Sequence, residues 1–467
     1  MLHYAFPENN HLADHHQKLF NSRKIGIWGF GVVGKSTLTY IDQFQPTSID
    51  ILDTKTIKLP TTKNITRCIQ QTPETIATFL ATNDLILVSP GIKLHDYQEY
   101  GHKFINELDL LHKATKNSII AITGTIGKTS ITHLLEKIIQ HTYPKTIAAG
   151  NIGNPMLSLI TNPQEHAILE LSSFQLQPIQ AFAPDLAIIT NFYPNHLDHH
   201  QTIDEYFRAK CNILRYQTEK QQALLPLDLM DQITSVMSPH RNWNLCSANL
   251  PTDEELNKYG QHTIYYLDEM QIYQIKNGCK QQIFNITTLP VITFDTNWLI
   301  IIAACHLYNI PLTSIAPAVN DIQLPDHRLQ KIGSFNGLTF YNDSKSTVWQ
   351  ATLQAVKAMD ATIPLALFLG GLSKGADRKP LIEGLRQHTN IKIYAFGKEA
   401  QQIVDLCKAY HIPAYNYQTL DEAFDSCMQQ SSSPTTILLS PGGSSFDLFA
   451  DYQARGIYFT QLVQKYR

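Results

Sequence analysis

Short apolar runs alternate along this chain with stretches in which apolar residues recur every three or four positions. The short runs predict buried strands, and the periodic stretches predict amphipathic helices. The clearest pair is a strand-like run at 118–122 and a helix-like stretch at 131–139. Because such alternation is typical of βαβ units around parallel sheets, we predict an α/β fold.

The main apolar runs all end at glycine or at polar residues. In open α/β sheets, ligands bind at the carboxyl ends of the strands, so this punctuation predicts a site built from several strand ends. The runs are 24–28, 85–88, 119–122, 167–169, 186–189, 338–341, 365–369 and 437–439.

The length of 467 residues favours several domains over a single core. We place one boundary after a helix-like stretch at 97–112 and another before residue 324. The expected domains are 1–112, 113–323 and 324–467. The stretch 215–290 is rich in Gln and Asn, alternates Tyr with Ile, and predicts an antiparallel part of the middle domain.

Charge and composition narrow the range of partners. The net charge is −3 and the pI is near 6.7, so we expect no nucleic-acid or anionic-membrane partner. The seven cysteines include no CxxC pair, which argues against a structural zinc site and a disulfide framework. This cysteine content fits a protein of a reducing compartment. Residues 1–20 are polar, unlike a signal peptide, and the longest apolar run, 298–305, is too short to span a bilayer. We therefore expect a cytoplasmic protein with no membrane span.

The most informative segment is Thr-Gly-Thr-Ile-Gly-Lys-Thr-Ser at 123–130, between the predicted strand and helix. Its glycines let backbone N–H groups turn toward an anion, and the helix N-terminus adds partial positive charge. Lys128 would reach the outer phosphates of a nucleotide, and the Thr129 hydroxyl would contact Mg²⁺. We predict that the protein uses ATP or GTP to drive its reaction.

A second segment, Gly-Phe-Gly-Val-Val-Gly-Lys-Ser at 29–36, fits two patterns at once. It matches the dinucleotide fingerprint GxGxxG and the phosphate-loop pattern GxxxxGK[ST]. A strand-like run follows and ends at Asp53, at the spacing of an acidic residue that reads a ribose or a base. We interpret 29–36 as a loop for a nucleotide-linked substrate or cofactor, and 123–130 as the triphosphate loop. The alternative is that one of them is only a tight turn between strand and helix.

Candidate metal ligands follow two later predicted strands. Glu170 ends one strand, where its carboxylate can hold an Mg²⁺ that Thr129 also touches. The cluster Asn-His-Leu-Asp-His-His at 195–200 follows the other strand, and His196 can ligate a second divalent ion. The alternative for this cluster is a solvated polar loop. A dinuclear zinc hydrolase of the HxHxDH type is disfavoured, because Pro194 replaces the first histidine.

Lys210 lies on a predicted amphipathic helix, where a lone lysine is usually solvated. Beside metal ions its ammonium group would be repelled. A deprotonated Lys210 would instead capture CO₂, and the resulting carbamate would be a bridging anion.

With these segments in this order, the chain resembles the Mur ligases, the ATP-dependent amino-acid ligases of peptidoglycan synthesis. The similarity covers almost the whole chain, and its most specific segments are Glu-Leu-Ser-Ser-Phe-Gln-Leu at 170–176 and Ser-Pro-Gly-Gly-Ser-Ser-Phe-Asp at 440–447. Within the family, the chain looks most like the type that adds D-glutamate to UDP-N-acetylmuramoyl-L-alanine. The resemblance implies a Rossmann-like N-terminal domain for the UDP substrate, a central domain like P-loop ATPases, and a Rossmann-like C-terminal domain for the amino acid.

The resemblance also assigns roles to individual residues. For the UDP-linked substrate it implies Gly31, Val32, Val33, Asp53, Thr54, Ser89, Pro90, Gly91, Asn151, Ser172 and Gln175. For the amino acid it implies Thr347, Lys374, Ser445 and Tyr452. For ATP it implies Gly124, Thr125, Gly127, Lys128, Thr129, Ser130, Asn191, Arg328 and Asp343. For catalysis it implies Lys128, Glu170, His196, Lys210 and Lys345, and for two Mg²⁺ ions Thr129, Glu170, His196 and carbamylated Lys210.

The implied reaction is amide formation driven by ATP. The substrate carboxylate attacks the γ-phosphate to give an acyl phosphate, and the amine of D-glutamate then displaces phosphate. We expect the C-terminal domain to close about residues 320–328, since the ATP loop and the amino-acid pocket are on different domains. We also expect a monomer whose partners are small-molecule substrates.

Four positions depart from the family pattern. Ile126 replaces a usual Asn beside the phosphates, and Asn195 stands where an acidic or polar residue precedes the His. The segment Phe-Asp-Thr-Asn at 294–297 replaces the usual His-Asn-x-x-Asn, so a contact to adenine is expected to be missing or remade. Asp326 is inserted before His327. These changes affect the expected nucleotide affinity and reaction rate more than the assignment to the family.

Other functions stay open as alternatives. Another Mur ligase would differ in the amino-acid pocket. A folylpolyglutamate synthase shares the middle and C-terminal domains but lacks the uracil-reading first domain, and the pair Asp53-Thr54 in this chain argues against it. An NAD-dependent oxidoreductase would leave Lys128, Glu170 and Lys210 without a role, and a non-catalytic nucleotide sensor would need a degenerate site.

Overall fold

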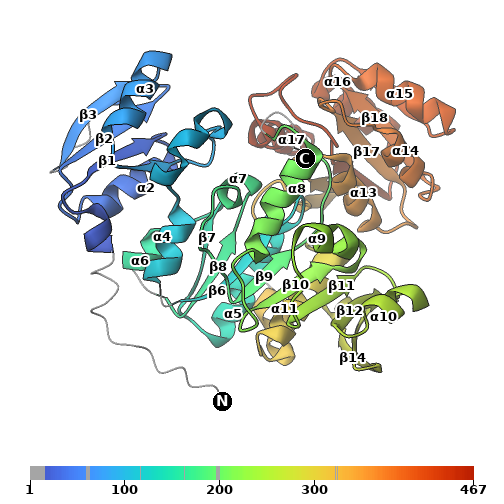
Figure 1. Cartoon of the computed structure of the whole chain (residues 1–467). Coiled ribbons are helices and arrows are strands. Elements are labelled where there is room, and N and C mark those ends of the chain that lie inside the picture. The colour runs from blue at the N-terminus through green and yellow to red at the C-terminus, as the bar shows by residue number, and fades with distance from the viewer. Residues whose placement is uncertain are drawn as a thin grey trace.

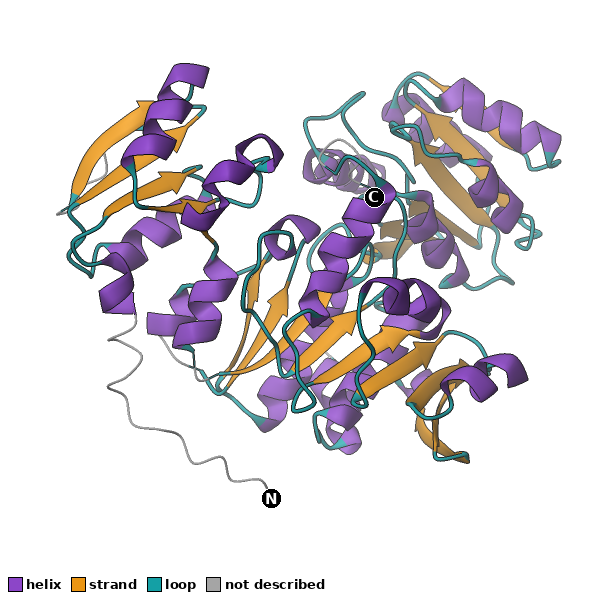
Figure 2. Ribbon diagram, in the orientation of Figure 1, coloured by secondary structure: helices purple, strands orange, loops and turns teal. Residues whose placement is uncertain are grey.

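The computed structural model describes residues 16–58, 64–115, 117–161, 164–195, 200–320, 322 and 324–467. These residues form three mostly parallel β-sheets with helices packed on their faces (Figures 1 and 2), so the predicted α/β class is confirmed. None of the described helices combines the length and the apolar character that a membrane span requires. All seven cysteines are free thiols.

The N-terminal sheet has the strand order β3-β2-β1-β4-β5, with all pairs parallel. Its strands are β1 (Lys24–Trp28), β2 (Ser48–Asp53), β3 (Ile65–Gln70), β4 (Leu85–Val88) and β5 (Phe104–Ile105). Its helices are α2 (Val32–Ile41), α3 (Pro73–Thr82) and the 3₁₀ helix η1 (His95–Lys103). Helix α4 (Glu107–Ala114) follows β5, and its Leu108 and Leu111 lie in a core of the central sheet. Since β1 lies between β2 and β4, the loops after β1 and β4 meet at the switch point where doubly wound sheets bind ligands.

The helix predicted over 97–112 is interrupted, and this expectation was wrong. Phe104–Ile105 pairs with β4 as a short strand. Asn106 then starts a new helix, because its side chain accepts a hydrogen bond from the amide of Asp109.

The central sheet has the order β14-β13-β12-β11-β10-β9-β6-β8-β7. Its strands are β6 (Ser118–Thr123), β7 (Thr146–Gly150), β8 (His166–Glu170), β9 (Leu186–Ile189), β10 (Gln222–Pro226), β11 (Trp243–Ser247), β12 (Thr263–Asp268), β13 (Gln271–Lys276) and β14 (Cys279–Asn285). The prediction of an antiparallel 215–290 was right only in its last part. Strands β10 to β12 are parallel, since a helix connects each to the next, whereas a two-residue turn forces β13 back along β12.

Helices cover both faces of the central sheet. The helices and 3₁₀ helices of this region are α5 (Lys128–Thr142), α6 (Ser158–Thr161), α7 (Ser173–Leu176), α8 (Ile203–Cys211), η2 (Asn212–Leu214), η3 (Leu227–Leu229), α9 (Met230–Val236), α10 (Asp253–Tyr259), η4 (Ile286–Thr288), α11 (Asp295–Leu307), η5 (Leu312–Ser314) and α12 (Ile315–Val319). Apolar side chains of α5, α11 and α12 fill one core, and those of α4, α8 and α9 fill the other. The long apolar run 298–305 is buried within α11.

The C-terminal sheet has the order β15-β16-β20-β17-β18-β19, and only the β15–β16 pair is antiparallel. Its strands are β15 (Gln330–Phe335), β16 (Leu338–Asn342), β17 (Leu365–Gly370), β18 (Ile391–Phe396), β19 (Ala414–Tyr417) and β20 (Thr435–Leu439). Its helices are α13 (Trp349–Lys357), α14 (Lys379–Leu385), α15 (Ala400–Ala409), α16 (Leu420–Gln430) and α17 (Tyr452–Tyr466).

The two smaller sheets lie on the same side of the central sheet (Figures 1 and 2). Residues from strand ends of the central sheet line one cavity with the N-terminal part and another with the C-terminal part. The three sheets occupy residues 24–105, 118–285 and 330–439. The boundaries proposed near 112 and 323 stay predictions.

Candidate active site

A cavity of about 360 Å³ lies where strand ends of the central sheet meet the C-terminal part of the chain. Many of the predicted site residues line it, although they are far apart in sequence. They are Thr125, Gly127, Lys128, Thr129, Ser130, Asn151, Glu170, Ser172, Lys210, Arg328, Asp343, Lys345, Thr347 and Tyr452. The polar ends of separate strands therefore come together in one hollow, as expected for an open α/β sheet.

The loop 123–127 turns directly into α5. Gly127 is the N-cap of this helix with a φ of +86°, and no described side chain caps the helix. A Cβ at this position would lie 2.5 Å from Oδ1 of Asn297, so glycine is required for both conformation and space. Because no side chain of the described residues bonds to them, the first amides of α5 are available to an anion such as a phosphate.

Two lysine side chains converge on this loop. Lys128 Nζ donates to the carbonyl oxygens of Gly124 at 2.9 Å and Thr125 at 3.0 Å, and Lys210 Nζ donates to that of Gly124 at 2.6 Å. Lys210 is only 3% exposed, and burial together with the charge of Lys128 lowers its pKa well below the usual value. Burial also lowers the pKa of Lys128, while Glu170 opposes that effect. A buried amine with a lowered pKa is chemically suited to react with CO₂.

Glu170 ends β8 with a carboxylate that is 2% exposed. Asn151 donates to its Oε1 at 2.8 Å, whereas Oε2 is buried and has no hydrogen-bond partner among the described residues. A buried carboxylate oxygen is costly unless a donor or a cation meets it. Since the Thr129 hydroxyl lines the same cavity, this pair of oxygen donors fits Mg²⁺, which prefers oxygen ligands. In the described part of the chain, no cluster of three His, Cys, Asp or Glu residues could hold a metal by itself.

His196 falls outside the described residues, so its role as a ligand stays a prediction. Tyr206 lines the cavity and was missed by the sequence analysis. Its ring centroid lies 4.6 Å from Lys210 Nζ, and its hydroxyl is 3.3 Å from the Thr125 hydroxyl. The signal that would have found it is the i, i+4 spacing of Tyr206 and Lys210 on α8.

Asn191 supports the loop 123–127, called the ATP loop below because the sequence predicts that it binds ATP, and does not line the cavity. Its Oδ1 accepts hydrogen bonds from the amides of Thr125 at 3.2 Å and Ile126 at 3.0 Å, and its Nδ2 donates to the Ile126 carbonyl at 3.1 Å. Thr190 donates to the same carbonyl at 2.8 Å. The side chain thus fixes the loop conformation, and a direct contact of Asn191 with ATP stays a prediction.

The loop after β16 forms the C-terminal wall of the cavity. The Asp343 carboxylate is buried within the wall, where it accepts hydrogen bonds from the Ser440 hydroxyl at 2.8 Å and the Leu329 amide at 3.1 Å. Burial raises the pKa of Asp343 to about 6. Lys345 Nζ lies 3.9 Å from the ring centroid of Tyr452, and burial lowers the pKa of Lys345 to about 8 with help from the charges of Arg328 and Lys128.

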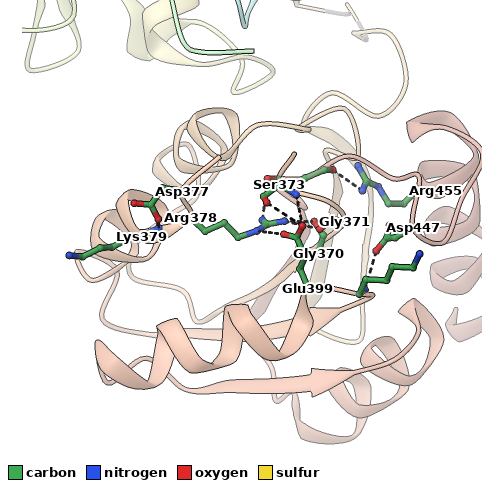
Figure 3. A network of polar contacts seen from close by, with 12 residues as sticks. Gly370, Gly371, Ser373, Asp377, Arg378, Lys379, Glu399, Asp447 and Arg455 are labelled. Atoms are coloured by element: carbon green, nitrogen blue, oxygen red, sulfur yellow. Dashed lines mark hydrogen bonds and ion pairs between the residues drawn. The ribbon is translucent and has the colours of Figure 1, made fainter. Parts of the chain in front are cut away.

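Lys374 and Ser445, predicted to bind the amino acid with Thr347 and Tyr452, do not line this cavity. They lie on the loops after β17 and β20. Lys374 Nζ is 5.8 Å from the ring centroid of Phe446, the neighbour of Ser445. Figure 3 shows the polar network that holds these two loops together.

A second cavity of about 260 Å³ lies between the N-terminal part and the central sheet. Of the residues predicted to contact the UDP-linked substrate, Val33, Ser89, Pro90 and Gln175 line it. Phe174 lines both cavities, so they adjoin at α7.

Other residues of the predicted UDP site lie around the loop after β1. Gly31 is the N-cap of α2, and Val32 beside it is 73% exposed. Asp53 accepts hydrogen bonds from the amides of Phe30 at 2.6 Å and Lys55 at 2.8 Å. Thr54 and Gly91 are exposed and line neither cavity.

The altered segment 294–297 has two consequences at the cavity. Asn297 still meets the ATP loop at Gly127, and its Nδ2 donates to Thr293 at 2.8 Å. Phe294 lines the cavity and packs against the apolar core of the C-terminal part. Ile126 also lines the cavity, so the side chain at this position is apolar where the family pattern has an amide.

Comparison with known proteins identifies the family. A family model described as the Mur ligase middle domain matches residues 122–290. A UDP-N-acetylmuramoylalanine–D-glutamate ligase of Thermoanaerobacter sp. (strain X514) is 30% identical over 401 residues, covering 83% of this chain and 86% of the relative. A ligase of the same name from Protochlamydia amoebophila (strain UWE25) is 30% identical over 464 residues, covering 95% and 98%. This chain belongs to the Mur ligase family.

Mur ligases are ATP-dependent ligases, and this chain is one of them. A solved structure of a MurF ligase from Thermotoga maritima in complex with ADP matches with a TM-score of 0.55 and 13% identity, covering 97% of each chain. At this identity the likeness concerns the fold, and it confirms the three-domain α/β architecture expected from the sequence.

Proposed function

We propose that this chain joins D-glutamate to the carboxylate of UDP-N-acetylmuramoyl-L-alanine, converting ATP to ADP and phosphate, in peptidoglycan precursor synthesis in the cytoplasm. The observation that carries the proposal is the meeting of Lys128, Glu170 and Lys210 with Lys345 and Thr347 around one cavity. The names of the two relatives above support D-glutamate as the amino acid.

The two adjoining cavities suit a substrate that extends from a nucleotide to a reacting carboxylate. The UDP end would bind at the loop after β1, with Asp53 near the uracil. The sugar would pass Ser89 and Gln175 in the smaller cavity, and the alanine carboxylate would reach Asn151 beside the ATP loop. Phe174, which lines both cavities, marks the passage between them.

The cationic side chains would balance the charge of two reacting anions. Lys128 and Lys345 would offset charge on the γ-phosphate while the carboxylate oxygen attacks phosphorus and the bond to ADP breaks. The amine of D-glutamate would then attack the acyl carbon, lose a proton and release phosphate. Lys374 would pair with a carboxylate of D-glutamate as a point charge.

Glu170 and Thr129 would hold Mg²⁺, and carbamylated Lys210 with His196 a second ion. When bound, these ions neutralise phosphate oxygens and draw the substrate carboxylate toward phosphorus. Formation of the carbamate joins the neutral amine of Lys210 to CO₂ and releases a proton, so the depressed pKa of Lys210 supports this modification.

The amino-acid loops lie outside the larger cavity, so we propose that the C-terminal domain closes on the central domain when ATP and the first substrate are bound. Closure would bring Lys374 and Ser445 toward Thr347 and Tyr452.

The testing experiment measures phosphate release with ATP, Mg²⁺ and UDP-N-acetylmuramoyl-L-alanine against a panel of amino acids. Release with D-glutamate alone is expected. Release with another amino acid would keep the ligase chemistry and replace D-glutamate. No release with any of them would contradict the proposed substrate pair.

A further inference from the structure

A buried arginine, Arg378, connects three loops at the carboxyl ends of β17, β18 and β20 (Figure 3). Its Nη2 donates to the Gly371 carbonyl at 2.8 Å, and its Nη1 donates to the Gly442 carbonyl at 3.2 Å. Its Nε forms an ion pair with Glu399 at 3.1 Å. Arg378 is 3% exposed, so its guanidinium is a buried group that links these loops and not a surface charge.

Glu399, the ion-pair partner of Arg378, also bonds to the loop that carries Lys374. It precedes α15, and its Oε1 accepts hydrogen bonds from the amide of Ser373 at 2.9 Å and from its hydroxyl at 3.2 Å. Ser373 is the residue before Lys374. The Arg378–Glu399 pair therefore holds both sides of the loop that carries Lys374.

Direct contacts between the two glycine-rich loops show how closely they pack. Leu372 and Ser444 exchange two backbone hydrogen bonds, of 2.7 and 2.8 Å. A Cβ on Gly443 would lie 2.7 Å from Arg378 Nη2, so the backbone passes directly against the guanidinium. Arg455 donates a hydrogen bond to the Gly443 carbonyl at 3.0 Å, and it also donates to the hydroxyl and carbonyl oxygens of Ser344, the neighbour of Lys345.

Lys374 itself has a φ of +53°, a left-handed conformation that non-glycine residues adopt only when their surroundings impose it. The positive charge of Arg378 is matched by Glu399 and by carbonyl oxygens, so it is not available to a ligand carboxylate. Lys374 is more exposed than Arg378 and forms no ion pair among the described residues. The two cationic side chains therefore differ in role. Arg378 stabilises the conformation of the loops, whereas the ammonium group of Lys374 is accessible to an anionic ligand.

We infer that Arg378, together with Glu399, is a positioning residue that sets the distance between Lys374 and Ser445 and thereby the affinity for the incoming amino acid. This inference rests on the proposed role of Lys374 and Ser445 in binding D-glutamate. Arg378 lines neither the larger cavity, where ATP is expected, nor the smaller cavity, where the UDP-linked substrate is expected. Its loss should therefore act on one substrate of three.

The test compares Arg378→Met with Lys379→Met, which removes the same charge at the next residue. Lys379 is a suitable control because its side chain is 56% exposed and its contact with Glu383, at 3.9 Å, is a surface pair. Steady-state kinetics with each substrate varied should show the KM for D-glutamate rising about 10- to 100-fold in Arg378→Met, with the KM for ATP within about twofold of the parent. Lys379→Met should leave all three KM values unchanged.

Arg378→Lys separates charge from geometry. An ammonium cannot reach Glu399 and two separate carbonyl oxygens as the guanidinium fork does. An intermediate KM for D-glutamate supports the inference, and a KM equal to the parent value overturns it. Equal rises in all three KM values would also overturn it, since they would show a general loss of structure.

Hydrogen exchange distinguishes this inference from the proposed function. The amides of 371–375 and 442–445 should exchange faster in Arg378→Met than in Lys379→Met, at equal thermal stability of the rest of the chain. If the parent enzyme releases no phosphate with any amino acid, the proposed function fails while the exchange comparison still decides whether Arg378 orders the two loops. Unchanged exchange in these segments would overturn the inference.

Discussion

The side-chain amine of Lys210 donates a 2.6 Å hydrogen bond to the carbonyl of Gly124, across 86 residues of sequence. This contact places a buried amine against the loop that is expected to hold ATP. It also shows why Lys210 is not the solvated helix lysine that its sequence neighbourhood would suggest.

The carbamate proposal predicts that Lys210→Ala is nearly inactive, because the anion that would hold a metal ion is lost. Short-chain carboxylates should restore part of the phosphate release, since they can occupy the vacated space as anions. Arg208→Ala is the control, because Arg208 is exposed on the same helix and pairs with Asp204. Normal activity in Lys210→Ala would show that no carbamate is needed.

Lys128→Ala should lower the rate of phosphate release by about 100-fold or more, as is typical when a charge that stabilises a transition state is removed. The protein should stay folded, since among the described residues Lys128 Nζ donates to just two carbonyls, both in the neighbouring loop. Lys137→Ala, in the exposed part of the same helix, should behave like the parent enzyme in the same assay. A folded Lys128→Ala variant with the parent rate would refute the phosphate role.

Much of the architecture could be predicted from the pattern of apolar runs, because each parallel strand is short, apolar and followed by glycine or a polar residue. The break in the helix expected over 97–112 could not be predicted, because the apolar spacing continues across Asn106. The pairing of 104–105 with β4 and the N-cap at Asn106 end one element and start the next despite this spacing. The loop 123–130 and the end of β8, which the sequence analysis expected to share a metal ion, do line one cavity, while the roles of their residues stay predictions. Asn191 was assigned to the nucleotide, and sequence alone does not reveal that its amide faces the loop backbone. Arg378 carried no sequence signal, since its partners are carbonyl groups and a distant glutamate.

The pKa of Lys345, lowered by burial to about 8, predicts a limb in the pH profile. Above about pH 8 the free enzyme loses the Lys345 proton and with it a charge that attracts the phosphates, so kcat/KM for ATP should fall as pH rises. Lys345→Arg should move this limb to higher pH, because a guanidinium keeps its proton. The measurement is kcat/KM for ATP from pH 6 to pH 10 in both proteins. The same limb in Lys345→Arg would assign it to another group.

Lys374→Met should raise the KM for D-glutamate far more than the KM for ATP, since Lys374 lies outside the larger cavity, where ATP is expected to bind. A rise of about tenfold or more is expected for a lost charge-assisted contact. Initial rates at varied D-glutamate and fixed saturating ATP give the answer. Lys392→Met, on an exposed position of β18, serves as the charge-matched control. Equal rises in both KM values would show that Lys374 supports the structure of the whole site and does not bind the amino acid specifically.

Asn191→Ala should weaken both the ATP loop and the fold. The substitution removes the acceptor for the Thr125 and Ile126 amides and the donor for the Ile126 carbonyl. The Ile126 carbonyl keeps its hydrogen bond from Thr190, and the Thr125 amide keeps one to the Asn191 backbone carbonyl, so among the described residues the Ile126 amide alone loses its partner. An unpaired, partly buried amide should lower the free energy of unfolding by about 1–3 kcal/mol. The loop would then be less ordered before ATP binds, so the KM for ATP should rise while the KM for D-glutamate stays close to the parent value. Urea unfolding and steady-state kinetics test the two effects separately, with Asn416→Ala, an exposed asparagine of β19, as the control. An unchanged KM for ATP with the expected loss of stability would mean that Asn191 supports the fold without shaping the nucleotide site.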